Sequence, residues 1–290
     1  MTTLVIIGNG FDIQNGLPTS YGDFHEQYSS KLNDILEHFP NFYHDQEWSY
    51  FEENLAVFNE DDFRESSVLE PSMDDMIESS KYVYGYNDEV SEKVDELVDS
   101  VQISFSAWVR SIDVNKSSQF MEFPEGCKFI TFNYTPTLQQ IYLVYEKDVL
   151  HIHGKAKGHI VFGHGSGNGN QASSLPFDEN EPWFEEANQS LASVTDRFYK
   201  PVSQILDNNR SELEGYDNII KIIVIGHSIN EIDTPYFNSM LEAYPEAIWE
   251  NWNYDEGIME THDKLLNIGV PEDKLTSLCS SQLGHFYPCP

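Results

Sequence analysis

Two hydrophobic patterns alternate along this chain. Residues 4–7 and 219–225 are apolar at nearly every position, which is typical of strands buried on both faces of a parallel sheet. Elsewhere apolar residues recur at three- or four-residue spacing, as at Val90, Val94 and Leu97, which predicts amphipathic helices. Strands that alternate with helices predict an α/β fold, here a Rossmann-like parallel sheet with helices on both faces.

The same patterns predict the order of the elements. Strands are expected at 3–8, 127–132, 149–152, 160–162, 219–225, 247–251 and 275–278. Helices are expected at 21–37, 49–58, 73–84, 90–108, 136–145, 182–208, 234–243 and 256–266. Pro136 suits the first turn of its helix and Thr135 suits the N-cap, because the N–H groups of a first turn have no partner within the helix.

One segment stands apart by its acidic residues. Residues 60–114 carry many Asp and Glu side chains in a helical pattern and lie between two predicted strands. We therefore predict a helical insertion or cap at 60–114. The remaining segments, 1–59 and 115–290, are predicted to form one nucleotide-binding α/β domain.

The charge of the chain limits its partners. Its 16 Lys and Arg residues against 49 Asp and Glu residues give a formal net charge of −33. Nucleic acids and anionic membranes bind to clustered Lys and Arg, so neither is expected as a partner. Residues 149–177 nevertheless contain no Asp or Glu, although they include Lys155 and Lys157. An acid-free surface of this kind suits a small anionic ligand.

The cysteines and the apolar runs predict a cytoplasmic protein. Cys127, Cys279 and Cys289 are odd in number and have no C-x-x-C spacing, which argues against a disulfide framework and a structural zinc site. The first residues lack the basic region of a signal peptide. No apolar run approaches the length of a membrane span.

Small or polar residues follow the end of four predicted strands. These segments are 8–12, 133–135, 153–154 and 226–228. In open α/β sheets ligands bind beyond the carboxyl ends of the strands, so we expect the four segments to converge on one crevice.

The first of these segments has a G-x-G turn. Gly8 and Gly10 lack a Cβ, so their backbone can approach a phosphate, and the following helix offers N–H groups. A G-x-G turn alone is weak evidence, and a tight turn that binds nothing remains the alternative.

Six motifs resemble the AbiH family of bacterial abortive-infection proteins. They are GNGFD at 8–12, GLPTSYGDF at 16–24, TFNYT at 131–135, HIHG at 151–154, FGHG at 162–165 and GHSINEIDTPYF at 226–237. They occur in the expected order over nearly the whole chain. The resemblance implies a role in defence against bacteriophages.

A more distant resemblance to sirtuins implies an NAD site. Sirtuins have a G-A-G turn, then G-I-P, N-x-D, H-G and G-x-S in this order. The counterparts here are 8–10, 16–18, 133–135, 153–154 and 226–228. The sirtuin zinc cysteines are missing, which puts protein deacylation in doubt. Thr135 replaces the sirtuin Asp, which removes a negative charge near the nicotinamide.

The resemblance implies hydrolysis of the nicotinamide–ribose bond of NAD, with NAD as substrate or ligand and no metal. His153 is expected to be the general base, because a neutral imidazole can accept a proton from water or a ribose hydroxyl. The amide of Asn133 is expected to hold that water or the ribose. The expected cofactor-binding residues are Gly8, Asn9, Gly10, Phe11, Asp12, Pro18, Thr19, Tyr134, Gly154, Gly226, His227, Ser228 and Asp233.

Each assignment has an alternative. His153 can be a structural residue, Asn133 can cap a turn, and Asp12 can be a helix residue favoured by the helix dipole. Ser228 and Asp233 can cap the helix at 234–243. The whole crevice can serve a non-enzymatic nucleotide-binding sensor or scaffold within a defence complex. A homo-oligomer or a partner protein fits either function, and a metal requirement would favour a different nucleotide hydrolase.

His151 is not expected to share a metal ion with His153. The two histidines alternate on a predicted strand, so their side chains point to opposite faces. A serine hydrolase is also disfavoured, since the chain has no G-x-S-x-G elbow.

Overall fold

The computed structural model describes residues 2–42, 48, 50–68, 70–165 and 182–289. Within these residues the chain forms two compact units. The α/β unit comprises Met1–Ser20, Val109–Val161 and Pro201–Pro290, and the helical unit comprises Tyr21–Trp108 and Phe162–Lys200. The sequence predicted a narrower helical part, 60–114. Part of the acid-free stretch, 166–177, lies outside the described residues.

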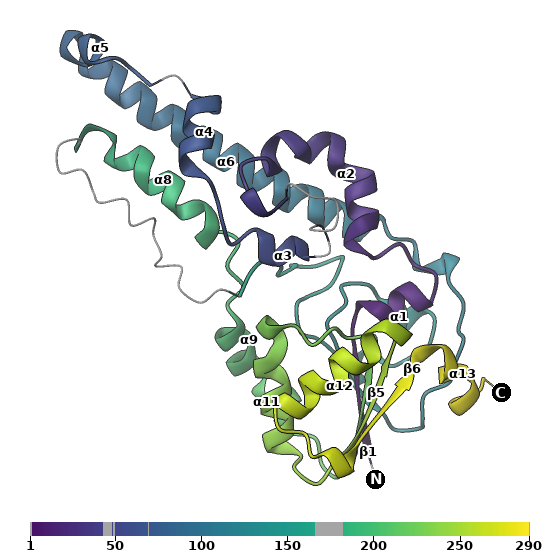
Figure 1. Ribbon diagram of the computed structural model, residues 1–290. Coiled ribbons are helices and arrows are strands. Elements are labelled where there is room, and N and C mark those ends of the chain that lie inside the picture. The colour runs from purple at the N-terminus through teal and green to yellow at the C-terminus, as the bar shows by residue number, and fades with distance from the viewer. Residues whose placement is uncertain (1, 43–47, 49, 69, 166–181, 290) are drawn as a thin grey trace. The chain divides into compact units, whose positions relative to one another are not determined.

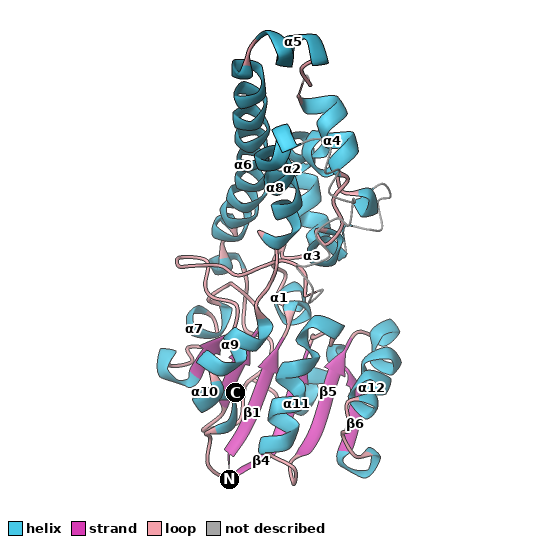
Figure 2. Ribbon diagram, turned by 90° about the vertical axis from the view of Figure 1, so that its left-hand side faces the viewer, coloured by secondary structure: helices cyan, strands magenta, loops and turns pink. Residues whose placement is uncertain are grey.

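The α/β unit contains a six-stranded parallel sheet in the order β3-β2-β1-β4-β5-β6, which confirms the predicted fold class (Figures 1 and 2). The strands are β1 Thr2–Ile7, β2 Lys128–Thr131, β3 Val149–His151, β4 Ile219–Ile225, β5 Ile248–Asn253 and β6 Leu275–Cys279. Leu4 of β1 is in register with Lys128 of β2 and Ile222 of β4. Strand β1 therefore lies between the two halves of the sheet.

Successive residues of β1 and β4 pack on opposite faces of the sheet. Leu4, Ile6, Ile222 and Val224 belong to one hydrophobic cluster, and their neighbours Val5, Ile7, Ile223 and Ile225 belong to the other. The first cluster includes residues of α9 Val202–Asn208, α10 Arg210–Glu214, α11 Thr234–Ala243 and α12 Ile258–Asn267. The second includes residues of α1 Asn9–Gln14, α7 Thr137–Gln140 and α13 Leu283–Phe286. Burial on both faces explains the uninterrupted apolar runs.

The helical unit has an aromatic core. Its helices are α2 Tyr21–Leu36, α3 Phe51–Asn54, α4 Glu60–Ser67, α5 Met73–Glu78, α6 Ser80–Ser111 and α8 Glu185–Asp196, of which α6 ends in the α/β unit. Phe24 packs edge-to-face on Phe51 and Phe105, with ring centroids 5.1 and 5.6 Å apart. Such pairs add to the stability that burial alone gives. The described aromatic residues between 21 and 59 therefore belong to this unit.

A buried ion pair also belongs to the helical unit. Lys200 Nζ lies 2.7 Å from Glu52 Oε2, and both side chains are buried. The backbone N–H of Gly163 donates to the same oxygen at 3.1 Å. A Cβ on Gly163 would lie 1.8 Å from the carbonyl oxygen of Phe198. The FGHG motif thus helps to hold this buried pair.

Four predicted elements differ from the observed ones. The helix predicted at 136–145 ends at Gln140, and Leu143 adopts a φ of 55°. The predicted strand at 160–162 is reduced to an isolated bridge between Ile160 and Gly154. The helix predicted at 49–58 is limited to α3, and the helix predicted at 73–84 ends at Glu78, because α6 begins at Ser80. The helices predicted within 182–208 are observed as α8 and α9.

Side chains satisfy the first turn of helix α5. Helix α5 begins with a capping box formed by Ser72 and Asp75, which satisfies backbone donors of its first turn. Helix α4 lies within the segment 60–114 that was predicted to be helical, although no separate helix was predicted there. Within the described part of the chain, no helix is both long and apolar enough to cross a membrane.

Candidate functional site

The sheet reverses its strand order between β1 and β4. The chain builds β1, β2 and β3 in one direction and then β4, β5 and β6 in the other. This is the order of doubly wound dinucleotide-binding folds, in which the ligand binds at the point of reversal, beyond the carboxyl ends of the strands. The predicted site residues follow β1, β2, β3 and β4 at this edge.

The turns after β1 and β4 pack directly on each other. Gly10 N–H donates to the carbonyl oxygen of Gly226 at 2.8 Å. A Cβ on Gly8 would lie 2.5 Å from that oxygen, and a Cβ on Gly226 would lie 2.4 Å from the backbone nitrogen of Phe11. Gly226 also has a φ of 62°, which favours glycine. The packing of the two turns therefore requires these glycines without any ligand.

This packing changes the expected role of the glycine turn. The N–H groups of Gly8, Gly10 and Phe11 donate to the carbonyls of Ile225, Gly226 and Gly8. These donors were expected to face a phosphate, and they are instead used within the protein. The ring of Phe11 is fully buried and lies 5.2 Å from that of Tyr142, so its side chain belongs to the core.

The loop at 16–20 folds back on the start of α1. Asn9 Nδ2 donates to the carbonyl of Thr19 at 2.7 Å, and Leu17 N–H donates to that of Asp12 at 3.0 Å. Pro18 is exposed. The hydroxyl of Thr19 is buried and has no hydrogen-bond partner among the described residues, and its contact to a cofactor stays a prediction.

Asn133 joins the turns after β1 and β2. Its Nδ2 donates to the carbonyl of Gly8 at 3.1 Å, and its backbone N–H donates to Thr131 Oγ1. Neighbouring Tyr134 donates from its hydroxyl to the carbonyl of Val161 at 3.0 Å. Both residues therefore have structural contacts, and their contacts to a cofactor remain predictions.

Asp12 is a buried acid beside the same turns. Its side chain is fully covered, and Thr135 donates a hydrogen bond to its Oδ2. Its Oδ1 has no hydrogen-bond partner in the described part of the chain. Burial raises the pKa of Asp12 to about 6, against the opposite effect of Thr135, Thr137 and Asn133. Thr135 was predicted to be the N-cap of the following helix. Its hydroxyl contacts the carboxyl group of Asp12 instead.

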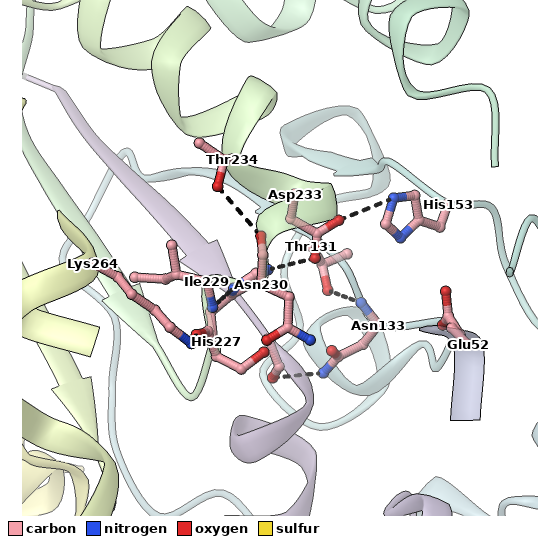
Figure 3. Close-up of polar contacts among 12 residues, drawn as sticks. Glu52, Thr131, Asn133, His153, His227, Ile229, Asn230, Asp233, Thr234 and Lys264 are labelled. Carbon is pink, nitrogen blue, oxygen red and sulfur yellow. Dashed lines mark hydrogen bonds and ion pairs between the residues drawn. The ribbon is translucent and has the colours of Figure 1, made fainter. Parts of the chain in front are cut away.

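Two histidines face one carboxylate, and we call these three residues the histidine–aspartate cluster: His153, His227 and Asp233 (Figure 3). His153 Nε2 lies 3.9 Å from Asp233 Oδ1, and His227 Nε2 lies 3.6 Å from Asp233 Oδ2. These are ion-pair distances that exceed those of hydrogen bonds. All three side chains are buried, which strengthens their electrostatic interaction.

Aromatic rings surround this cluster. The ring of Phe132 lies 4.3 Å from that of His227 and 5.3 Å from that of His153, in both cases nearly perpendicular. Tyr236 lies 5.8 Å from His153, and Phe237 lies 5.1 Å from His227. The apolar rings of residues after β2 and in α11 therefore fix the imidazole planes.

The position of Asp233 does not match a simple helix cap. It is the N-cap residue of α11, yet its side chain makes no capping hydrogen bond, and its carboxylate faces the histidines. Ser228 is exposed and lies outside the cluster, and its carbonyl accepts a hydrogen bond from Lys264 Nζ at 2.9 Å.

His151 has a structural role that separates it from His153. Gln139 donates to its Nε2 at 2.8 Å, and its Nδ1 donates to the carbonyl of Asn133 at 3.0 Å. Burial lowers the pKa of His151, so the neutral ring is favoured. Gly154 has a φ of 88°, and a Cβ there would lie 1.9 Å from the carbonyl oxygen of His159. The glycine of the HIHG motif thus permits this backbone contact.

Two residues near the site were not predicted. Asn253, at the end of β5, donates from Nδ2 to the carbonyl of His227 at 3.1 Å. Tyr254 donates from its hydroxyl to the carbonyl of Gly10 at 3.0 Å. Applying the strand-end rule to β5 would have found both. Among the residues that the structure describes, no group of three or more His, Cys, Asp or Glu side chains is placed to hold a metal ion.

Comparison with known proteins identifies the family. A model described as "Bacteriophage abortive infection AbiH" matches residues 4–251, which include the histidine–aspartate cluster and all four strand-end segments. No curated protein and no solved structure matches the chain. The family match covers most of the chain and includes the motifs at the point where the strand order reverses, between β1 and β4. The chain therefore belongs to the AbiH family of bacteriophage abortive-infection proteins.

Proposed function

We propose that this protein binds NAD in the cytoplasm, at the reversal point between β1 and β4, and hydrolyses its nicotinamide–ribose bond during phage defence. One observation carries the proposal: a buried histidine–carboxylate pair, His153 and Asp233, lies in the unit whose strand order is that of dinucleotide-binding sheets. The proposal combines this geometry with the sirtuin-like order of the motifs.

The reaction requires a base but no general acid. Water forms a bond to C1′ of the ribose while the bond from C1′ to the nicotinamide nitrogen breaks. Nicotinamide leaves as a neutral molecule with the electron pair of that bond, and the ribose passes through a cationic, oxocarbenium-like state. His153 would accept the proton that water loses, and Asp233 would stabilise the resulting imidazolium.

Asp12 supplies a further element of this proposal. Thr135 occupies the position of the sirtuin Asp, and its hydroxyl donates to the carboxyl group of Asp12. With a pKa of about 6, this carboxyl group is mostly ionised at neutral pH. The negative charge of Asp12 would replace the charge of the sirtuin Asp, which Thr135 lacks. A negative charge near the ribose favours a cationic transition state.

Nicotinamide release tests the proposal. Purified protein would be incubated with NAD, alone and with extract of phage-infected cells, and nicotinamide would be quantified by chromatography. We expect His153→Ala to reduce release at least about a hundredfold, as for loss of a general base. His159→Ala is the matched control, because this exposed histidine belongs to the same segment. Intact NAD under every condition, or full activity of His153→Ala, would contradict the proposal.

A second candidate function is a non-enzymatic nucleotide sensor that acts through a partner protein. The helical unit exposes apolar side chains where α5 meets α6, at Met73, Ile77, Tyr82 and Tyr84, with exposed fractions of 67, 80, 46 and 64%. Between residues 70 and 92, Lys81 is the single basic residue among many acids. This surface suits a partner protein whose binding face carries apolar side chains surrounded by basic ones.

Phage protection separates the two functions. A sensor would keep its protection phenotype in the His153→Ala variant, and ADP-ribose would still raise its melting temperature. The double variant Ile77→Ser, Tyr84→Ser would lose protection while keeping its melting temperature. Loss of protection in His153→Ala, with ADP-ribose binding retained, would favour the enzyme.

A further inference from the structure

A tight turn after β3 presents basic side chains at the surface of the α/β unit. The N–H of Gly158 donates to the carbonyl of Lys155 at 2.8 Å, which closes the turn. Arg110, near the end of α6, donates from Nε to the carbonyl of Ala156 at 2.9 Å. Arg110 and Lys157 are exposed, and the side chain of Lys155 is partly exposed. Backbone contacts therefore hold three cationic side chains close together.

A loop with large exposed apolar side chains lies beside this turn. Leu143 and Tyr145 are 78 and 75% exposed. Lys147 Nζ lies 5.7 Å from the centre of the Tyr145 ring, and Lys155 forms an ion pair with Glu146 of the same loop. The loop and the turn are therefore adjacent, and we call their exposed side chains the basic face: Arg110, Leu143, Tyr145, Lys147, Lys155 and Lys157.

The backbone of the loop is strained where it exposes its leucine. Leu143 has a φ of 55°, a left-handed conformation that is uncommon for residues other than glycine. The N–H of the next residue, Val144, donates to the carbonyl of Leu138 at 3.0 Å, which holds this conformation. Strained residues gather at functional sites, and large apolar side chains rimmed by polar residues mark contact surfaces. The basic face therefore has the character of a protein-binding surface.

Helix α5 carries the complementary combination of side chains. Met73 and Ile77, which are 67 and 80% exposed, lie four residues apart and so on the same side of the helix. Asp74 and Glu78 are also exposed and form the neighbouring row. Both views show α5 beside the beginning of α6 (Figures 1 and 2). We call these four residues the acidic face.

The charge of the chain decides which of its surfaces can meet. A formal net charge of −33 makes two copies repel each other over most of their surfaces. Lys147, Lys155 and Lys157 are three of only 16 Lys and Arg residues, and they fall within 11 positions of the sequence. Two basic faces repel each other, and so do two acidic faces, whereas a basic face attracts an acidic one.

We propose that copies of this chain associate head to tail, with the basic face of one copy on the acidic face of the next. The exposed apolar side chains of the two faces form the centre of the contact, and the lysines and carboxylates form its rim. A contact between unlike faces leaves one free face of each kind on every pair, so further copies add until a ring closes or a filament forms. This contact is independent of the binding and hydrolysis of NAD.

Mixing of two variants tests both the contact and its direction. Leu143→Gly with Tyr145→Ser removes the apolar part of the basic face, and glycine suits the left-handed backbone at 143. Ile77→Ser alters the acidic face. Analytical ultracentrifugation of the full chain at low salt should show wild-type assemblies that grow with concentration. Each variant alone should have a dissociation constant raised at least about tenfold, and their equimolar mixture should form a dimer that grows no further.

Met259→Ser is the matched control for these variants. Met259 is 65% exposed on α12 and belongs to neither face. This variant should assemble as the wild type does, because the removed apolar side chain lies outside the contact. Equal melting temperatures of all variants and the wild type would show that each chain is folded.

Cross-linking identifies the residues that meet. Unlabelled and ¹⁵N-labelled wild-type chains would be mixed and treated with a carbodiimide, which joins a lysine amine to a carboxylate in contact with it. Mass spectrometry should find cross-links between the two labels that join Lys147 or Lys157 to Asp74 or Glu78. Raising the salt concentration from about 0.05 to about 0.5 M should reduce both the cross-links and the assembly, because salt screens exposed charges.

Three outcomes would overturn the proposal. One is a wild type that stays monomeric at every concentration at low salt. Another is a mixture of the two variants that stays monomeric or that grows as the wild type does. The third is assembly whose cross-links between copies join other segments. If a variant of the basic face does not fold, Lys147→Glu with Lys157→Glu replaces it, since both lysines are exposed, and it should abolish assembly in the same way.

Discussion

Replacement of Asp12 by asparagine should change how stability depends on pH. Burial raises the pKa of this acid from an ordinary 3.8 to about 6. The folded protein therefore binds the proton more tightly than the unfolded chain does, and the contribution of Asp12 to stability falls as pH rises from about 4 to above 6. The full cost of ionising the buried group is about 3 kcal/mol, at 1.36 kcal/mol for each factor of ten in affinity for the proton.

The variant removes this cost and leaves other titrating groups in place. Asp12→Asn should therefore gain stability relative to the wild type as pH rises, by about 2 kcal/mol between pH 4.5 and 7. Urea unfolding of both proteins at several pH values, followed by circular dichroism, measures the difference. At low pH the two proteins should differ least, because the buried acid is then neutral.

A difference that is flat with pH would refute this reasoning. So would a variant that becomes less stable relative to the wild type as pH rises, since that would mean that an unrecognised partner stabilises the ionised form. Thr135→Val provides a further check, because it removes the hydrogen bond to Asp12 Oδ2. Its destabilisation should be larger at pH 7 than at pH 4.5.

Four further substitutions test the contacts around and beyond the site. Gly8→Ala should destabilise the protein by about 2 kcal/mol or more, because its Cβ would meet backbone atoms at 2.5 Å. Gly85→Ala in α6, with open space around it, should stabilise the protein by up to about 1 kcal/mol. A melting temperature equal to that of the wild type in either variant would refute the expectation for that variant. Asn133→Ala should cost about 1–3 kcal/mol, since it removes a donor to a buried carbonyl, and an unchanged urea midpoint would leave a purely ligand-binding role. Lys200→Met should cost about 3–5 kcal/mol by leaving Glu52 buried without this partner, and adding Glu52→Gln should recover much of the loss in the same assay.

The sequence predicted best where one local signal dominates. The run at 219–225 and the helix at 234–243 agree with β4 and α11 at both ends, because an uninterrupted apolar run and an early proline leave few alternatives. The helix predicted to reach residue 145 ends early, since Leu143 takes a left-handed conformation. A leucine side chain does not predict that conformation. Strand ends in the correct order placed the site residues at one edge of the sheet.

Contacts between distant residues were beyond such reasoning. The pairing of His153 with Asp233 joins positions 80 residues apart in the chain, and local patterns carry no information on such a distance. The hydrogen bond from the N–H of Ile229 to His227 Nδ1 forms at a left-handed backbone conformation of Ile229, which is unusual for isoleucine. The aromatic residues of 21–59 joined the helical unit because their rings pack on α6. Three-dimensional packing decided each of these features.

The packing of the two glycine turns has a consequence for the comparison of relatives. Because Gly8, Gly10 and Gly226 are required by contacts within the protein, a relative that has lost all chemistry must still keep them to fold. Their presence in a genome sequence therefore reports the architecture and not an activity. The pair His153 and Asp233 is under no such packing requirement from the turns. Under the proposed function, its presence or loss is therefore the better criterion for sorting family members into those that would catalyse the reaction and those that would only bind NAD.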